Sequence, residues 1–253
     1  SFQLNLPVAP ITDLRVHQGD LIAATSGRSF WVLDNLNLLQ QFKSEANNLV
    51  LFQPEKTLMV NGYSEMDGNG SDGTNPYRGV NPATGVVFYY QLPEVKDSDV
   101  LSFEIKDAQG NIVRAFTSIA DSTYKRYDGA PPMDPTISKS KGLNRFVWNM
   151  RYPTMVGVPN VYIESSYRGH KASPGKYTAT IKLGTQTVST EFEILPNPLY
   201  PTDAKTYQEY HTLMLNMEGE VNKMHRMVNT MFEKRVQLDE LLAQISSDKK
   251  YES

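Results

Sequence analysis

One short run contains several groups that could ligate a metal ion: Asp67-Gly68-Asn69-Gly70-Ser71-Asp72-Gly73. Carboxylate and amide oxygens on a glycine-rich loop are the ligands that Ca²⁺ requires, and Asp67, Asn69 and Asp72 would supply them. The run departs from an EF-hand loop, because Asp72 occupies the position of the invariant glycine and Arg78 that of the bidentate glutamate. The simpler interpretation is a surface loop of turn-forming residues. We therefore predict no cofactor, with calcium as the alternative.

Two pairs of carboxylates could in principle hydrolyse a glycoside, which needs two acids facing each other across a cleft. Asp97 and Asp99 lie in a predicted turn, and Glu191 and Glu193 share the polar face of a predicted strand. Both pairs are interpreted more simply as solvated surface. No serine lies in the glycine pattern of a nucleophile elbow. The residues themselves therefore identify no catalytic group.

Tyrosine side chains could bind a sugar, because flat aromatic faces suit pyranose rings. The candidates are Tyr63, Tyr77, Tyr89, Tyr90, Tyr152, Tyr162 and Tyr167. Tyrosine is also common on strands, and the adjacent Tyr89 and Tyr90 must point to opposite faces of theirs. A carbohydrate-binding module is therefore an alternative function, with its binding residues unassigned.

The histidines and the absent cysteines narrow the chemistry further. None of His17, His170, His211 and His225 shares a metal-binding spacing with another. His211 and His225 are fourteen residues apart in a predicted helix, a separation of about 21 Å. We expect them to be exposed or to flank a helical seam. The lack of cysteine excludes disulfides, thiolate zinc sites and cysteine nucleophiles.

The N-terminal part of the chain, residues 1–53, is predicted to be a short β-meander. Its last strand, Phe30-Trp31-Val32-Leu33, is apolar on both faces. Three short strands bury too little surface to be stable alone, so they must pack on the rest of this chain or on sequence outside it. Residues 54–85 are rich in glycine and are predicted to be a linker loop.

Residues 86–195 contain six predicted strands with period-2 alternation, as in Leu101, Phe103 and Ile105. Two antiparallel sheets packed face to face satisfy this pattern over about 110 residues, the size of an immunoglobulin-like sandwich. Trp31 and Trp148 are both predicted to be core residues. The predicted fold class is mainly β: an immunoglobulin-like sandwich, preceded by the meander and followed by a long helix or helical hairpin.

Residues 202–246 are predicted to form a coiled-coil-like helix, with an N-cap at Thr202-Asp203. The predicted interface comprises Tyr210, Met214, Met217, Val221, Met224, Val228, Met231, Leu238, Leu242 and Ile245. A single helix exposing such a stripe would be prone to aggregate. Docking on the sandwich alone would leave the distal half uncovered. A hairpin that folds back near Arg235 or self-association is therefore predicted, with a two-chain coiled coil slightly favoured.

Two stretches together suggest a family. Gly27-Arg28-Ser29-Phe30-Trp31-Val32-Leu33-Asp34 resembles the run that closes the propeller of sortilin-like, BNR-repeat bacterial proteins, and Asn81-Pro82-Ala83-Thr84-Gly85 resembles the entry to their following sandwich. These proteins are often labelled glycosyl hydrolases or xyloglucanase-like. The sandwich itself is similar to the flagellar hook-cap type of immunoglobulin-like domain, through residues 107–114, 142–151 and 174–177.

This resemblance implies a non-catalytic C-terminal accessory or scaffolding module of a larger secreted bacterial protein. Its partner would be the missing β-propeller, where any glycosidase site would lie, because no Asp-box repeat occurs in this sequence. A periplasmic or extracellular location is implied as well, and the start at Ser1 fits a fragment or a processed chain. The alternative is that the chain is part of an active glycoside hydrolase.

The composition limits the class of protein and the kinds of partner. The chain has 253 residues, 40% of them hydrophobic and 21% charged, which is typical of globular proteins. A net charge of −3 argues against a nucleic acid partner. No apolar run approaches the ~18 residues of a membrane span.

Overall fold

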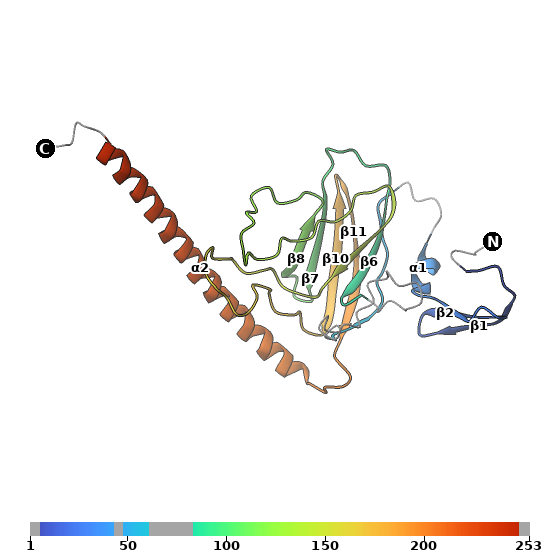
Figure 1. Ribbon diagram of the computed structural model, residues 1–253. Coiled ribbons are helices and arrows are strands. Elements are labelled where there is room, and N and C mark those ends of the chain that lie inside the picture. Colours follow the sequence, from blue (N-terminus) through green and yellow to red (C-terminus); the bar gives the residue numbers. More distant parts are fainter. Residues whose placement is uncertain (1–5, 43–47, 61–82, 248–253) are drawn as a thin grey trace.

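The computed structural model describes residues 6–42, 48–60 and 83–247 (Figure 1). The elements are, in order, β1 (Ile11–His17), β2 (Asp20–Thr25), β3 (Phe30–Leu33), α1 (Leu36–Gln41), β4 (Val50–Leu51), β5 (Thr57–Leu58), β6 (Val86–Leu92), β7 (Leu101–Asp107), β8 (Ile112–Thr117), β9 (Gly142–Trp148), β10 (Gly175–Leu183), β11 (Gln186–Leu195) and α2 (Ala204–Ser247). The fold is mainly β with one long C-terminal helix, which confirms the predicted class.

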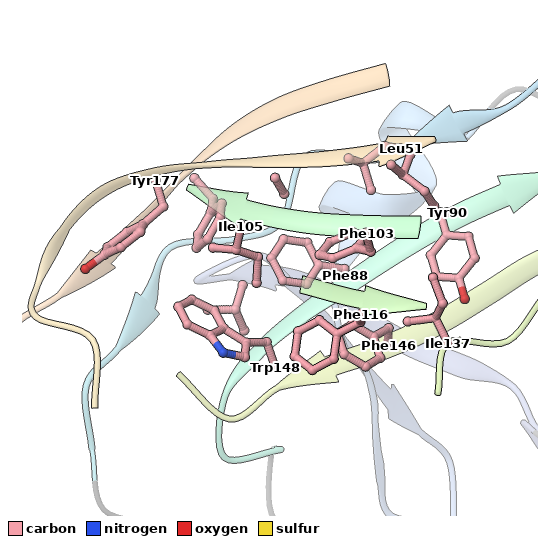
Figure 2. Packing of buried hydrophobic residues seen from close by; sticks show 14 of the residues in the cluster. Leu51, Phe88, Tyr90, Phe103, Ile105, Phe116, Ile137, Phe146, Trp148 and Tyr177 are labelled. Atoms are coloured by element: carbon pink, nitrogen blue, oxygen red, sulfur yellow. The ribbon is translucent and has the colours of Figure 1, made fainter. Parts of the chain in front are cut away.

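Two sheets form a sandwich. One is five-stranded, in the order β5-β11-β10-β7-β8, and the other is three-stranded, in the order β4-β6-β9. Only the short β5–β11 pairing is parallel among these strands. Phe88 and Phe146 of the smaller sheet meet Phe103 of the larger one, with ring centroids 4.9 and 5.6 Å apart (Figure 2). The core therefore lies between the sheets, as period-2 alternation requires.

Trp148 is part of this core, as predicted. Its side chain is almost fully buried, and its ring lies edge-on to Tyr177 and Phe192 (Figure 2 shows the first of these). The indole N–H donates a hydrogen bond to the carbonyl of Arg151 at 3.1 Å. Trp31, by contrast, is only half-buried, because no second layer covers its sheet within the part of the chain that the structure describes.

The sandwich begins earlier in the chain than residue 86. β4 pairs with β6 and β5 pairs with β11, and Leu49, Leu51 and Phe52 are buried. Residues assigned to the predicted meander and linker segments thus supply two edge strands to the sandwich. Residues 61–82, which include most of the predicted linker loop, lie outside the described residues.

The predicted meander is present as the antiparallel sheet β1-β2-β3. Some of its large apolar side chains are exposed on each face, with Leu14 and Val16 on one and Phe30 and Val32 on the other. The sheet joins the sandwich through α1, whose first backbone N–H donates to the carbonyl of Gly19 at 2.8 Å. In Figure 1 it lies on the opposite side of the sandwich from α2.

α2 is one uninterrupted helix of 44 residues, so the predicted hairpin near Arg235 is wrong. Asp203 caps its N-terminus by accepting a hydrogen bond from the backbone N–H of Thr206 at 2.7 Å, and that bond lowers the pKa of the Asp203 carboxyl. The first half of α2 lies beside the sandwich, and the second half projects away from it (Figure 1). Neither helix among the described residues is both long and apolar enough to cross a membrane.

The predicted helix interface spans two different faces of α2. Met214 and Val221 are half-buried along a cleft beside the sandwich. The remaining predicted positions are exposed: Tyr210, Met217, Met224, Val228, Met231, Leu238, Leu242 and Ile245. The face that docks on the sandwich is instead polar, and its side chains form the site described next.

Candidate functional site

A network of buried polar side chains lies where α2 docks on the connection between β9 and β10. In that connection two segments run antiparallel, joined by a bridge between Arg151 and Lys171 and by a hydrogen bond from the Tyr152 N–H to the His170 carbonyl at 2.9 Å. This pairing stacks the rings of Tyr152 and His170, with centroids 4.3 Å apart and planes 6° from parallel. We call Tyr152, His170, His211 and Glu218 the helix anchor.

Glu218 of α2 holds His170 by two hydrogen bonds. Its carboxylate accepts from the backbone N–H of His170 at 2.6 Å and from Nδ1 of the same residue at 2.9 Å. The His170 side chain is fully buried and that of Glu218 is nearly so. A two-point contact of this kind fixes both the position of α2 along the loop and the orientation of the imidazole.

The anchor continues through a second histidine. His170 Nε2 lies 2.8 Å from His211 Nδ1, and His211 Nε2 lies 3.4 Å from the Tyr152 hydroxyl. With both imidazoles neutral, one proton arrangement satisfies the whole chain: each Nδ1 donates, to Glu218 and to His170 Nε2 respectively, and the Tyr152 hydroxyl donates to His211. Four side chains from two elements are thereby joined in one network.

The protonation properties of the network favour a structural role. Burial lowers the pKa of His211, and the neighbouring His170 lowers it further. Burial also raises the pKa of Tyr152 to about 12. The hydroxyl at the end of the chain therefore stays protonated at neutral pH, and no serine or threonine hydrogen-bonds to either imidazole of the anchor within the described residues. The arrangement lacks the activated nucleophile of a hydrolytic triad.

Farther along α2, side chains bind the backbone of the same connection. Asn222 accepts from the Val156 N–H at 2.7 Å, and His225 Nδ1 lies 2.6 Å from the Val156 carbonyl. Asn229 donates to the Gly157 carbonyl at 2.8 Å. These contacts satisfy loop backbone groups that have no strand partner. They extend the docked face of α2 from the anchor to Asn229.

A cleft of about 550 Å³ opens beside the anchor, and its walls include Arg151, Arg168, Tyr207 and Glu218. Glu218 is the only acidic residue among the described residues that line it, and its carboxylate is already engaged by His170. The guanidinium of Arg151 donates to the Gly169 carbonyl at 2.8 Å. The cleft therefore lacks the two opposed carboxylates that glycoside hydrolysis requires.

The other acidic candidates form surface contacts. Asp99 accepts from the Lys96 backbone N–H at 3.0 Å and so closes the turn that contains Asp97. Glu193 pairs with Lys56 at 2.7 Å, and this partner lowers the pKa of its carboxyl. The calcium candidates Asp67, Asn69 and Asp72 lie outside the described residues. Within the described residues, no group of three or more His, Asp or Glu side chains could hold a metal ion.

The tyrosines do not gather into one platform among the described residues. Tyr90 and Tyr167 are buried, and Tyr152 belongs to the anchor. Tyr89 and Tyr162 line different clefts. Tyr162 alone of these five is highly exposed, at 87%. Tyr63 and Tyr77 lie outside the described residues.

The helix anchor was missed by the sequence analysis, which expected His211 and His225 to be exposed or to flank an apolar seam. The signal was present as polar side chains at helical spacing: His211, Glu218, Asn222, His225 and Asn229 follow one another by seven, four, three and four residues. The apolar periodicity instead predicted an interface on a neighbouring face of the helix. The docked face is polar because it binds loop backbone rather than a sheet surface.

Comparisons with known proteins found no match: no family model, no curated protein and no solved structure matches this chain. The resemblance to sortilin-like, BNR-repeat proteins therefore rests on the quoted sequence runs alone and stays a prediction.

Proposed function

We propose that this chain is a non-catalytic scaffolding module in which the sandwich holds the long helix α2 in a fixed orientation. The observation that carries the proposal is the helix anchor. Its buried Glu218 and His170 are engaged in mutual hydrogen bonds, so these buried polar groups serve to fix a helix. Buried polar networks that are fully satisfied specify one arrangement of the elements they join.

The second part of the proposal is that the module belongs to a larger secreted β-propeller protein, located in the periplasm or outside the cell. The sheet β1-β2-β3 supports this part. Leu14 and Val16 are exposed on one face and Phe30 and Val32 on the other. A propeller blade is packed between two neighbouring blades and needs apolar side chains on both faces. The missing propeller is therefore the partner that we propose for this sheet.

The test of this partnership starts from the reading frame upstream of Ser1. A propeller encoded there would be purified and mixed with this chain, and binding would be measured by isothermal titration calorimetry. We expect binding that is lost in the double variant Phe30→Asp/Val32→Asp and kept in Tyr162→Ala, which alters an exposed residue elsewhere. A propeller that binds both variants equally, or an upstream frame without a propeller, would contradict the proposed partnership.

Two alternatives stay open to experiment. A carbohydrate-binding module is supported by the exposed Tyr162, which borders a cleft of about 690 Å³ together with Asp128 and Arg168. Retardation in polysaccharide gels would reveal such binding, and Tyr162→Ala should then abolish it. Hydrolysis of aryl-glycosides or xyloglucan by this chain itself would overturn the non-catalytic assignment, whereas activity confined to the longer protein would place the catalytic site in the propeller.

A further inference from the structure

α2 carries a mostly apolar stripe whose centre lies on the side away from the sandwich. The stripe begins at Tyr210 and proceeds in alternating steps of three and four residues to Ile245. Its central residue, Met227, is nine positions from Glu218, which places the two about 180° apart around the helix axis. Every apolar side chain of the stripe is exposed, and Met231 reaches 70%. We call these positions the exposed stripe.

The 3-4 spacing is the pattern by which one helix packs along another. From Tyr210 to Ile245 the exposed stripe runs for about 50 Å at 1.5 Å per residue. A stripe of this length made mostly of apolar side chains is rarely left in water. The docking of α2 on the sandwich uses Glu218, Asn222 and Asn229 on another face. At the N-terminal end of the stripe, the Tyr210 ring centroid also lies 6.2 Å from that of His170, and Met217 lines the cleft beside the anchor.

Two charged residues interrupt the exposed stripe, and their placement is symmetrical. Glu220 lies seven residues before Met227, and Lys234 lies seven residues after it. The apolar positions have the same symmetry to within one residue. The stripe is therefore complementary to itself when two copies run in opposite directions about a two-fold axis at Met227.

We propose that two copies of this chain associate through the exposed stripe as an antiparallel helix pair centred on Met227. In this register Glu220 of each copy faces Lys234 of the other, so two ion pairs form. Leu213 faces Leu241 of the other copy, and Met217 faces its Leu238. This inference goes beyond the scaffolding role and requires no propeller.

The charges select the antiparallel direction. A parallel pair in register would set Glu220 against Glu220 and Lys234 against Lys234, and like charges at such positions are unfavourable. In the single chain Glu220 accepts from Lys223 at 3.2 Å, and Lys234 donates to Gln237 at 3.1 Å. These local contacts are solvent-exposed and hold the side chains only weakly. Both charged groups are therefore available to a second copy.

Charge exchange tests the register in the full chain. Sedimentation equilibrium would give the dimer dissociation constant for Glu220→Lys, for Lys234→Glu and for the double exchange. We expect each single variant to weaken association roughly tenfold and the double variant to restore it, because the double exchange rebuilds both ion pairs. Glu233→Lys, on the polar face of the same helix, is the matched control and should leave the constant unchanged.

Disulfide trapping tests the direction independently, because the chain has no cysteine of its own. Leu213→Cys and Leu241→Cys would be made as separate single variants and oxidised alone and mixed. We expect efficient cross-linking only in the mixture, as antiparallel pairing requires. Cross-linking of each variant with itself would show a parallel pair and overturn the proposal. A monomeric wild-type chain at high micromolar concentration, or a double charge exchange that fails to restore association, would overturn it as well.

Discussion

The sandwich and the sheet β1-β2-β3 are built from similar sequence patterns but differ in burial. Phe88 and Phe103 are fully buried because a second sheet covers them. Phe30, at 74% exposure, and Val32 belong to a sheet with no covering layer among the described residues. The difference teaches that alternation identifies the side chains that need burial. It does not identify what buries them.

The largest expected effect is at the centre of the sandwich. Trp148→Ala removes a large, almost fully buried side chain, and we expect it to lower the free energy of unfolding by about 3–5 kcal/mol. Chemical denaturation followed by circular dichroism would measure this. Trp31→Ala is the matched control, and its effect should be clearly smaller because Trp31 is only half-buried. Equal losses of unfolding free energy in the two variants would contradict the difference in burial between the two regions.

The next largest expected effect is at Gly85, directly before β6. Gly85 has φ of +148°, and a Cβ there would overlap the backbone carbonyl of Trp148. Because the overlap is with backbone, it cannot be relieved by a rotamer change, and we expect Gly85→Ala to cost about 1–3 kcal/mol. Gly27→Ala, in a turn of the β1-β2-β3 sheet with open space around it, tests backbone strain without overlap. A melting temperature of the Gly85→Ala variant equal to that of the wild type would refute this account.

Much of the fold could be predicted from sequence because it depends on local periodicity. Leu101, Phe103 and Ile105 alternate with polar residues and are buried as expected. The short strands β4 and β5 escaped prediction, because two residues are too few to show a period and their pairing with β6 and β11 is long-range.

The helix anchor could not be predicted for a related reason. His170 and Glu218 are 48 residues apart, and only the path of the chain between β9 and β10 brings them together. No spacing rule links a loop histidine to a helix glutamate. The helix hairpin failed for the opposite reason: Arg235 interrupts an apolar pattern, but nothing at that point breaks the backbone, since Arg is a good helix former.

The helix anchor itself should give an intermediate effect. In Glu218→Gln one of the two carboxylate acceptors becomes an amide donor that faces a His170 donor, and we expect a loss of about 1–3 kcal/mol in helix docking. Hydrogen exchange should rise in the first half of α2, with little change in β7 and β10. Glu240→Gln, on the projecting half, is the control. Unchanged exchange in Glu218→Gln would show that the anchor does not hold the helix.

Acidification should weaken the same docking to a smaller degree. Burial, with His170 nearby, lowers the pKa of His211 below its ordinary 6.5, although Asp107 and Glu218 oppose the shift. The undocked helix therefore binds the His211 proton more readily than the docked one. We therefore expect docking to be strongest above pH 6.5 and to decline as the pH falls through 6.5 toward the lowered pKa. Hydrogen exchange across this range should show the decline, and His211→Asn should flatten it.

The smallest expected effect lies in the sheet β1-β2-β3. Phe30 is a large apolar residue on a strand, yet it is 74% exposed, so Phe30→Ser removes few contacts. We expect the unfolding free energy of the sandwich to change by less than about 0.5 kcal/mol. Phe103→Ser, the same change at a buried position, is the matched control and should unfold the chain. A large loss in Phe30→Ser would mean that β3 already packs against this chain, and the sheet would then need no outside partner.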